Sequence, residues 1–189
     1  MNRLHQWILI ASTIVASWLG MEAVHESGHV VGAWLTGGRV ARVVLYPLTI
    51  SRTDLAENPH PLAVVWAGPI VGAVAPLLLW GAAVAMRLAG AFLLRFFAGF
   101  CLIANGFYIG VGSFGRIGDC GQMLQNGSPI WTLWLFGLIA APLGIWLWNR
   151  QGRYFGLGPN AATPPGRAAI GSLVVCAALL TLGFLTDGR

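Results

Sequence analysis

Long apolar stretches are the feature that most constrains how this chain can fold. Hydrophobic residues make up 57% of the 189 residues and charged residues only 9%, whereas a soluble domain carries about a quarter charged residues. A run of about 20 apolar residues is long enough to cross a bilayer as a helix. We therefore expect an all-α integral membrane protein that folds as a single membrane domain over residues 1–189.

Five segments are long and apolar enough to be transmembrane helices. The N-terminal start resembles a secretory signal peptide, but we expect no cleavage because the apolar character continues to Leu35. The predicted helices span residues 7–35, 62–86, 91–113, 130–148 and 168–186. Between them we expect an irregular glycine-rich segment at 112–121 and a polar loop at 149–167.

The charged residues and the cysteines exclude several classes of protein. The formal net charge is +5, and the arginines are scattered among the predicted loops. Scattered arginines suit contact with the lipid bilayer rather than with nucleic acid, which is bound by clustered basic residues. Cys101, Cys120 and Cys176 lack paired spacing, so we predict neither a disulfide framework nor a cysteine zinc site.

The first predicted helix contains an H-E-x-x-H motif at residues 25–29. Positions four apart share a helix face, so His25 and His29 can offer two imidazole nitrogens to one metal ion, with Glu26 in reach of a water at that metal, as in zinc hydrolases. The alternative is two structural histidines and a buried glutamate. Ionisable groups inside a membrane need partners and are usually functional, which favours the zinc site.

The predicted membrane crossings indicate a third ligand for the zinc ion. If the first three segments each cross the bilayer, the ends of the first and third emerge on the same side, and Asp119 follows the third. A catalytic zinc site has three protein ligands plus a water, so we predict that His25, His29 and Asp119 bind one Zn²⁺ per chain. The alternative is an ordinary loop carboxylate at Asp119. A lone loop histidine, His60, is expected to be solvated.

A short membrane-associated β-hairpin is expected beside this site. Residues 39–46 and 48–53 are rich in β-branched side chains, and residues 48–51 alternate apolar and polar. The competing interpretation is an amphiphilic interfacial loop, and residues 54–61 are expected to be a polar turn. A membrane-spanning substrate must unwind before it is cleaved, and the hairpin would hold the unwound strand by edge pairing at Val44 and Ile50.

Three groups of residues together resemble the site-2 protease (M50) family of intramembrane zinc metalloproteases. The first is the segment 24–29. The second, Ala67-Gly68-Pro69-Ile70, is similar to the A-G-P segment of the family. The third, residues 118–124 with the sequence G-D-C-G-Q-M-L, is similar to the L-D-G-G-x-x-L segment of the family. The order and spacing of the three are more specific than any one of them.

The resemblance implies a zinc metalloendopeptidase that carries out regulated intramembrane proteolysis on membrane protein substrates. It implies a three-helix catalytic core within residues 7–124, with accessory helices over about 129–186. Asp119 corresponds to the third zinc ligand of the family, and Glu26 to the base that takes a proton from water and passes it to the leaving amine. We expect a multi-pass protein of the inner (plasma) membrane, with the active site toward the cytoplasmic face.

The chain also departs from the family pattern. Gly72 stands where relatives usually have asparagine, and the N-x-x-P-x-P run before the aspartate is absent. Asn105 is a candidate for the missing amide, with a role either in supporting the transition state or in holding a metal ligand. Glu22 shares a helix face with His25, which predicts either an acceptor for the ring N–H of a ligand histidine or a carboxylate facing an aqueous channel. Cys120 replaces the first glycine after the aspartate, and we expect a free thiol there, the alternative being a zinc ligand.

Two other functions fit parts of the sequence. A non-proteolytic zinc-binding membrane scaffold or chaperone agrees with these departures, but a purely structural site needs no base such as Glu26. A transporter with an ion path through His25, Glu26 and His29 is less well supported, because five crossings contain no inverted repeat. No feature of the sequence specifies an oligomeric state.

Overall fold

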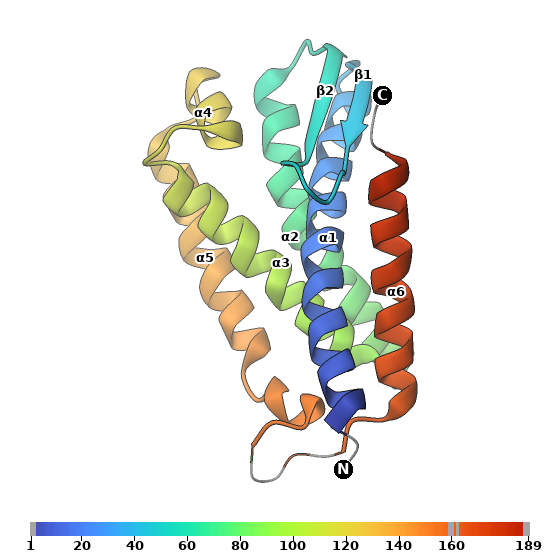
Figure 1. Ribbon diagram of the computed structural model, residues 1–189. Coiled ribbons are helices and arrows are strands. Elements are labelled where there is room, and N and C mark those ends of the chain that lie inside the picture. Colours follow the sequence, from blue (N-terminus) through green and yellow to red (C-terminus); the bar gives the residue numbers. More distant parts are fainter. Residues whose placement is uncertain (1–2, 159–160, 162, 187–189) are drawn as a thin grey trace.

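A computed structural model describes residues 3–158, 161 and 163–186. Helix α1 is followed by a β-hairpin, four helices, a short 3-10 helix and a final helix (Figure 1). Their bounds are α1 Arg3–Leu35, β1 Arg39–Val44, β2 Arg52–Glu57, α2 Pro61–Ala85, α3 Ala91–Gly112, α4 Gly118–Gln125, α5 Ile130–Trp148, η1 Gln151–Phe155 and α6 Gly166–Leu185.

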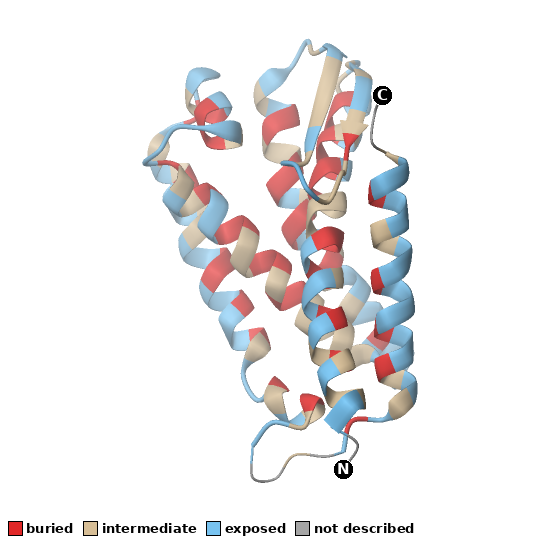
Figure 2. Ribbon diagram, in the orientation of Figure 1, coloured by how far each residue is buried: buried red, intermediate tan, exposed pale blue. Residues whose placement is uncertain are grey.

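Five helices, α1, α2, α3, α5 and α6, are long and apolar enough to cross a membrane. Their outward faces are exposed, while their buried residues face one another (Figure 2). Many of the exposed side chains are large and apolar, such as Leu78, Leu138 and Leu173. Such a surface is unfavourable in water and suits lipid. The expectation of a mostly helical chain with five candidate spans and a small two-stranded sheet is therefore confirmed.

Helix α1 lies at the centre of the bundle, with α2 and α6 packed against it, and α3 packs against α2 and α5 (Figure 1). The hairpin and α4 lie at one end of the bundle, and the N-terminus and η1 lie at the other. Helix α1 has 33 residues, which corresponds to a length of about 50 Å. It therefore reaches from one end to the other and carries its C-terminal half to the hairpin end.

Small residues bring α3 and α5 into backbone contact. A Cβ added at Gly137 of α5 would lie 2.8 Å from the Cα of Gly110 of α3, and one added at Gly106 would lie 2.7 Å from the backbone nitrogen of Ala141. Small residues allow this close approach in membranes, where helix association depends on van der Waals packing. Helix α5 thus supports the end of α3 that leads into α4.

The hairpin exists, but its second strand lies later in the chain than the sequence indicated. Strand β2 begins at Arg52 and includes part of the expected polar turn. Ion pairs of Arg39 with Glu57 and of Arg42 with Asp54 align the two strands. The hydrogen bonds from the Arg42 guanidinium hold the pKa of the Asp54 carboxyl below its usual range. The charges that suggested a turn are therefore cross-strand pairs.

Ile50, expected to be a strand residue, lies in the connecting loop and is 86% exposed. A turn precedes it, in which the Thr49 N–H donates to the Tyr46 carbonyl at 3.1 Å. Pro47 lies within this turn and cannot donate to a strand ladder, which explains why pairing stops at Val44.

The segment expected to be irregular at 112–121 contains the start of α4. This helix buries Cys120 and Met123 against Val65, Ile109 and Leu133. The 149–167 loop contains η1, and residues 159, 160 and 162 of it lie outside the described residues. The observed bounds of the five long helices differ from the predicted ones by at most four residues.

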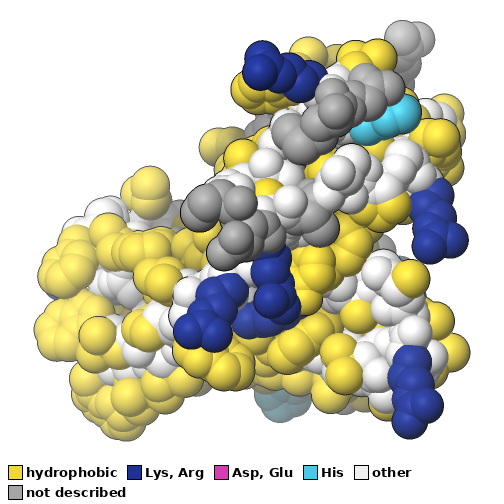
Figure 3. Space-filling model, turned by 90° about the horizontal axis from the view of Figure 1, so that it is seen from below, with side chains coloured by type: hydrophobic (Ala, Val, Ile, Leu, Met, Phe, Trp, Pro, Cys, Tyr) yellow, Lys and Arg dark blue, Asp and Glu magenta, His cyan; other side chains and the backbone are white. Residues whose placement is uncertain are grey.

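Arginines lie at the end of the bundle that is opposite the hairpin. Seen from below, arginine groups lie among apolar side chains, and no acidic side chain is visible on this face (Figure 3). The chain positions at this end are Arg3, Arg87, Arg95, Arg150, Arg153 and Arg167. Arginines at helix ends beside apolar surface suit contact with lipid headgroups.

The α3–α5 contact predicts a position-dependent effect of adding one methyl group. Gly137→Ala would overpack this contact, and we expect it to lower the free energy of unfolding by about 1–3 kcal/mol. Gly81→Ala in α2 is the matched control, because a Cβ there meets nothing within 4 Å. Thermal unfolding of the purified chain in detergent compares the two variants. Equal thermal unfolding midpoints for the two variants would contradict the close contact between α3 and α5.

Candidate metal centre

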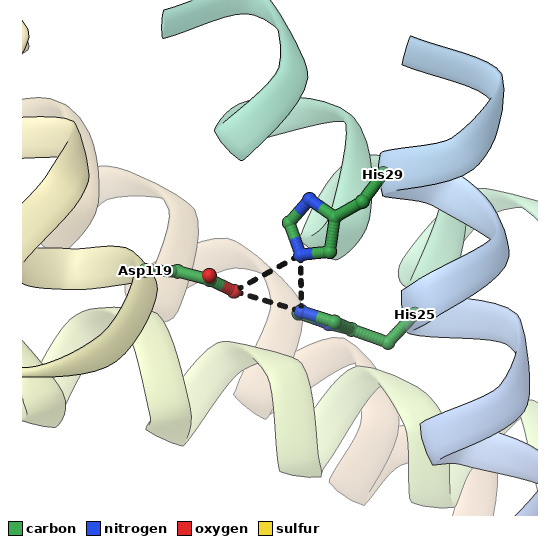
Figure 4. A group of neighbouring side chains, drawn as sticks. All are labelled: His25, His29 and Asp119. Carbon is green, nitrogen blue, oxygen red and sulfur yellow. Dashed lines mark hydrogen bonds and ion pairs between the residues drawn. The ribbon is translucent and has the colours of Figure 1, made fainter. Parts of the chain in front are cut away.

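Three side chains from two elements meet at the hairpin end. His25 and His29 extend from α1, and Asp119 extends from the first turn of α4 (Figure 4). The Asp119 Oδ2 atom lies 2.8 Å from His25 Nε2 and 3.4 Å from His29 Nε2. The two Nε2 atoms lie 3.1 Å apart. These three residues could hold a metal ion, and we call them the metal-binding group.

The other nitrogen of each ring is already bonded. His25 Nδ1 lies 2.7 Å from Asn105 Oδ1, and His29 Nδ1 lies 2.9 Å from the Val64 carbonyl oxygen. The Asn105 amide is oriented by its own NH₂ group, which donates to the Cys101 carbonyl at 2.9 Å. Both partner oxygens only accept, so both rings carry a proton on Nδ1 and leave Nε2 for a ligand.

Three acceptor atoms therefore converge inside the protein, and both histidines are only 7% exposed. Burial alone would raise the pKa of the Asp119 carboxyl, but the two histidine rings, when they also carry a proton on Nε2, donate hydrogen bonds that outweigh burial and hold this pKa well below its usual range. The carboxylate stays ionised. A bound cation, or a proton added to Nε2, is needed to balance two lone pairs facing a carboxylate. Two imidazoles and one carboxylate form a donor set typical of catalytic zinc.

Glycines allow α1 and α2 to approach closely at this point. A Cβ added at Gly68, the glycine of the A-G-P segment, would lie 3.0 Å from His25 Nε2 and would collide with the His29 ring. On α1, a Cβ added at Gly28 would collide with the backbone of Ala67. The close packing explains why the A-G-P segment of this chain has glycine at its centre, since only glycine leaves room for the imidazole rings.

Contacts with Tyr108 of α3 hold Asp119 and the start of α4 in place. The Asp119 backbone N–H donates to the Tyr108 hydroxyl at 3.0 Å, and the Cys120 thiol donates to the Tyr108 carbonyl at 3.2 Å. Burial raises the pKa of the Cys120 thiol to about 11, so it stays protonated and acts as a hydrogen-bond donor. Cys120 is a free cysteine, as expected, and does not belong to the metal-binding group.

The Glu26 carboxylate lies beside the metal-binding group and is held by the hairpin. Its side chain is buried, and the residue is 4% exposed. The Ser51 hydroxyl donates to Oε1 at 3.0 Å, and the Thr53 hydroxyl donates to Oε2 at 2.8 Å. A cavity of about 790 Å³ connects Glu26 with the metal-binding group. Its walls are formed by α1, the hairpin, α2, α3 and α4.

The structure corrects the expected role of Glu22. Glu22 lines the cavity, but Asn105 and Val64 occupy the remaining nitrogens of both histidine rings. The expectation that Glu22 accepts a hydrogen bond from a ligand histidine is therefore wrong. The observed position agrees with the alternative, a carboxylate that faces the cavity.

Asn105 contacts a candidate metal ligand, which is one of the two roles expected for it. A Cβ at Gly72 would lie 2.9 Å from the Asn105 amide nitrogen, so the amide from α3 occupies the space beside Gly72. Its oxygen and nitrogen are both engaged, with His25 and Cys101. Asn105 therefore orients His25, and its amide is not a free donor toward the cavity.

The remaining expected residues lie outside the metal-binding group. His60 is at the N-terminal end of α2, and Val44 is buried at the end of β1. Sequence reasoning missed Ser51, Thr53 and Tyr108. The polar positions of the 48–51 alternation were a signal for Ser51, but no sequence pattern indicated Tyr108.

The hydrogen bond of Asn105 to His25 predicts a graded effect on metal affinity. Asn105→Leu removes the acceptor and frees the ring to rotate, so we expect zinc affinity to fall about 10–100-fold. Asn105→Asp is the matched control, because it keeps an acceptor oxygen. Competition with a chromogenic chelator measures both affinities, and His29→Ala gives the value for a lost ligand. Wild-type affinity in Asn105→Leu would contradict the assigned role.

Comparisons with known proteins gave no match to this chain. No family model, no curated protein and no solved structure matches it.

Proposed function

We propose that this chain is an intramembrane zinc metalloendopeptidase that cleaves membrane protein substrates within or near their transmembrane segments. One observation carries the proposal: a buried carboxylate, Glu26, lines the same cavity as the metal-binding group. A structural metal site needs no such base, whereas hydrolysis does. The three sequence motifs that resemble the site-2 protease family support the same activity.

The residues divide the chemistry between them. His25, His29 and Asp119 would hold zinc, which supplies a Lewis acid that polarises the scissile carbonyl and acidifies water. Glu26 accepts a proton as the water oxygen attacks the carbonyl carbon. Glu26 then donates this proton to the amide nitrogen as the C–N bond breaks, which leaves a carboxylic acid and an amine.

The residues that line the cavity support a substrate that arrives from the lipid. Its wall includes Trp18 and Met21, which precede His25 on α1 by seven and four residues and so lie about 6–10 Å farther along the helix. Trp18 is 51% exposed on the apolar face of the bundle. At the hairpin end the wall includes Arg52 and Asn58. A membrane helix and water can thus approach the reacting groups from different ends of one cavity.

The proposal includes the orientation implied by the family resemblance, with the site toward the cytoplasmic face of the inner (plasma) membrane. It also includes a role for the hairpin, which would pair with the unwound substrate strand through its edge. The two-stranded sheet has free edges within the described part of the chain.

Glu26→Gln tests the protease activity directly. We expect wild type and variant to bind about one zinc per chain, and cleavage of single-span model substrates to fall about 10²–10⁴-fold in the variant, because the base is lost. Metal analysis and gel-based cleavage measure the two properties. If both chains bind zinc and neither cleaves any substrate of the panel, the non-proteolytic scaffold is favoured. If neither binds zinc, the metal assignment is wrong.

Strand docking predicts that proline substitutions separate cleavage from metal binding. Ile50→Pro removes one backbone N–H from the loop without touching the β1–β2 pairs, and Val44→Pro removes one at the last pair. We expect both to impair cleavage and to leave zinc content unchanged. Ile50→Ala keeps the N–H and is the matched control. Parallel loss of zinc and cleavage would argue against docking and for a general collapse of the site.

A further inference from the structure

We infer that Ser51 and Thr53 are positioning residues for Glu26, so that the hairpin sets the orientation of the base. The inference rests on the proposed function, because it assigns these two hydroxyls a role in the step that Glu26 would perform. Neither residue belongs to the motifs that resemble a known family.

Two hydroxyls bind the two oxygens of one carboxylate separately. The Ser51 hydroxyl is 3.0 Å from Oε1 and the Thr53 hydroxyl is 2.8 Å from Oε2. One hydrogen bond leaves a carboxylate free to rotate about its terminal bond, whereas two donors on different oxygens fix its plane. Each carboxylate oxygen can accept more than one hydrogen bond. The bound oxygens therefore still have room for a proton from water.

The register of the hairpin brings these two side chains to the same place. In an extended chain, residues two apart point to the same side. Ser51 and Thr53 point toward α1, while Arg52 between them is exposed and pairs with Asp54. Thr53 is held by its pairing with Val43, and Arg52 by its pairing with Val44. A register shift of one residue would point Arg52 at Glu26 instead.

Because Glu26 is buried, its hydrogen bonds with Ser51 and Thr53 have a large effect on the position of its carboxylate. A buried carboxylate depends on hydrogen bonds from the protein, and hydrogen bonds to a charged group are about twice as strong as neutral ones. Glu26 adjoins His25 in sequence, and His25 is itself fixed by Asn105. The ligands are thus oriented by α2 and α3, and the base by the hairpin. The segment proposed to receive the substrate strand is therefore the one that aligns the base.

The matched pair Thr53→Val and Thr53→Ser isolates the hydroxyl. Valine keeps the shape of threonine and lacks the hydroxyl, and serine keeps the hydroxyl. With the full-length chain and a model substrate, we expect Thr53→Val to lower kcat about tenfold, the effect of one charge-assisted hydrogen bond. KM and zinc content should not change, and Thr53→Ser should restore kcat. Combining Thr53→Val with Ser51→Ala should lower kcat further. Thr181→Val on α6 controls for loss of a remote hydroxyl.

Three results would overturn the inference. The first is wild-type kcat in the combined variant. The second is a loss of zinc that accompanies the loss of kcat, which means that the hydroxyls support the ligands. The third is a Thr53→Ser variant as impaired as Thr53→Val, which means that the methyl group matters. All three require a wild type that cleaves, so they are distinct from failure of the proposed function.

A readout without catalysis tests the contact itself. Thr53→Val should lower the unfolding midpoint when Glu26 is present and leave it nearly unchanged in a Glu26→Leu chain, because the partner is then absent. Equal shifts in both backgrounds would show that the hydroxyl does not bind the carboxylate, which also overturns the inference. If wild type and Glu26→Gln cleave equally poorly while this coupling is present, the proposed function fails and the contact remains structural.

Discussion

The meeting of two imidazole nitrogens and one carboxylate inside the protein is the interaction on which the hairpin end of the bundle depends. Each ring is fixed through its other nitrogen, His25 by Asn105 of α3 and His29 by Val64 of α2. Asp119 arrives from α4. Four helices therefore contribute to one small volume, where unpaired polar atoms are strongly unfavourable. This requirement explains why His25, His29 and Asn105 each have a hydrogen-bond partner at this end.

Close packing of the helices allows His25, His29 and Asp119 to meet. Gly68 gives space to the rings, and Gly137 lets α5 support α3 from behind. Neither glycine takes part in the proposed chemistry. In a membrane the apolar surface of a helix is equally satisfied by lipid, so shape and small residues decide which helices meet. The accessory helices differ in this respect, because α5 supports the site through α3 while α6 packs along α1.

The hairpin forms one wall of the cavity that contains the site. Its outer side chains form ion pairs, and its inner hydroxyls reach Glu26. A two-stranded hairpin has little stability of its own. It is therefore held by α1 as much as it holds Glu26, so Glu26 and the hairpin depend on each other. Such mutual dependence is a physical basis for coupling between what binds at the hairpin and what Glu26 does.

The sequence alone determined the five long apolar helices, the shared face of His25 and His29, and the placement of Asp119 at the same end of the bundle as these histidines. These follow from local properties, namely the length of apolar runs, the helical period and the number of crossings. Tertiary structure alone decided that Asn105 rather than Glu22 orients His25, that α4 forms, and that Ser51 and Thr53 reach Glu26. Those choices depend on register between segments 25 to 80 residues apart, and helical or strand periodicity gives the face of an element but not its partner.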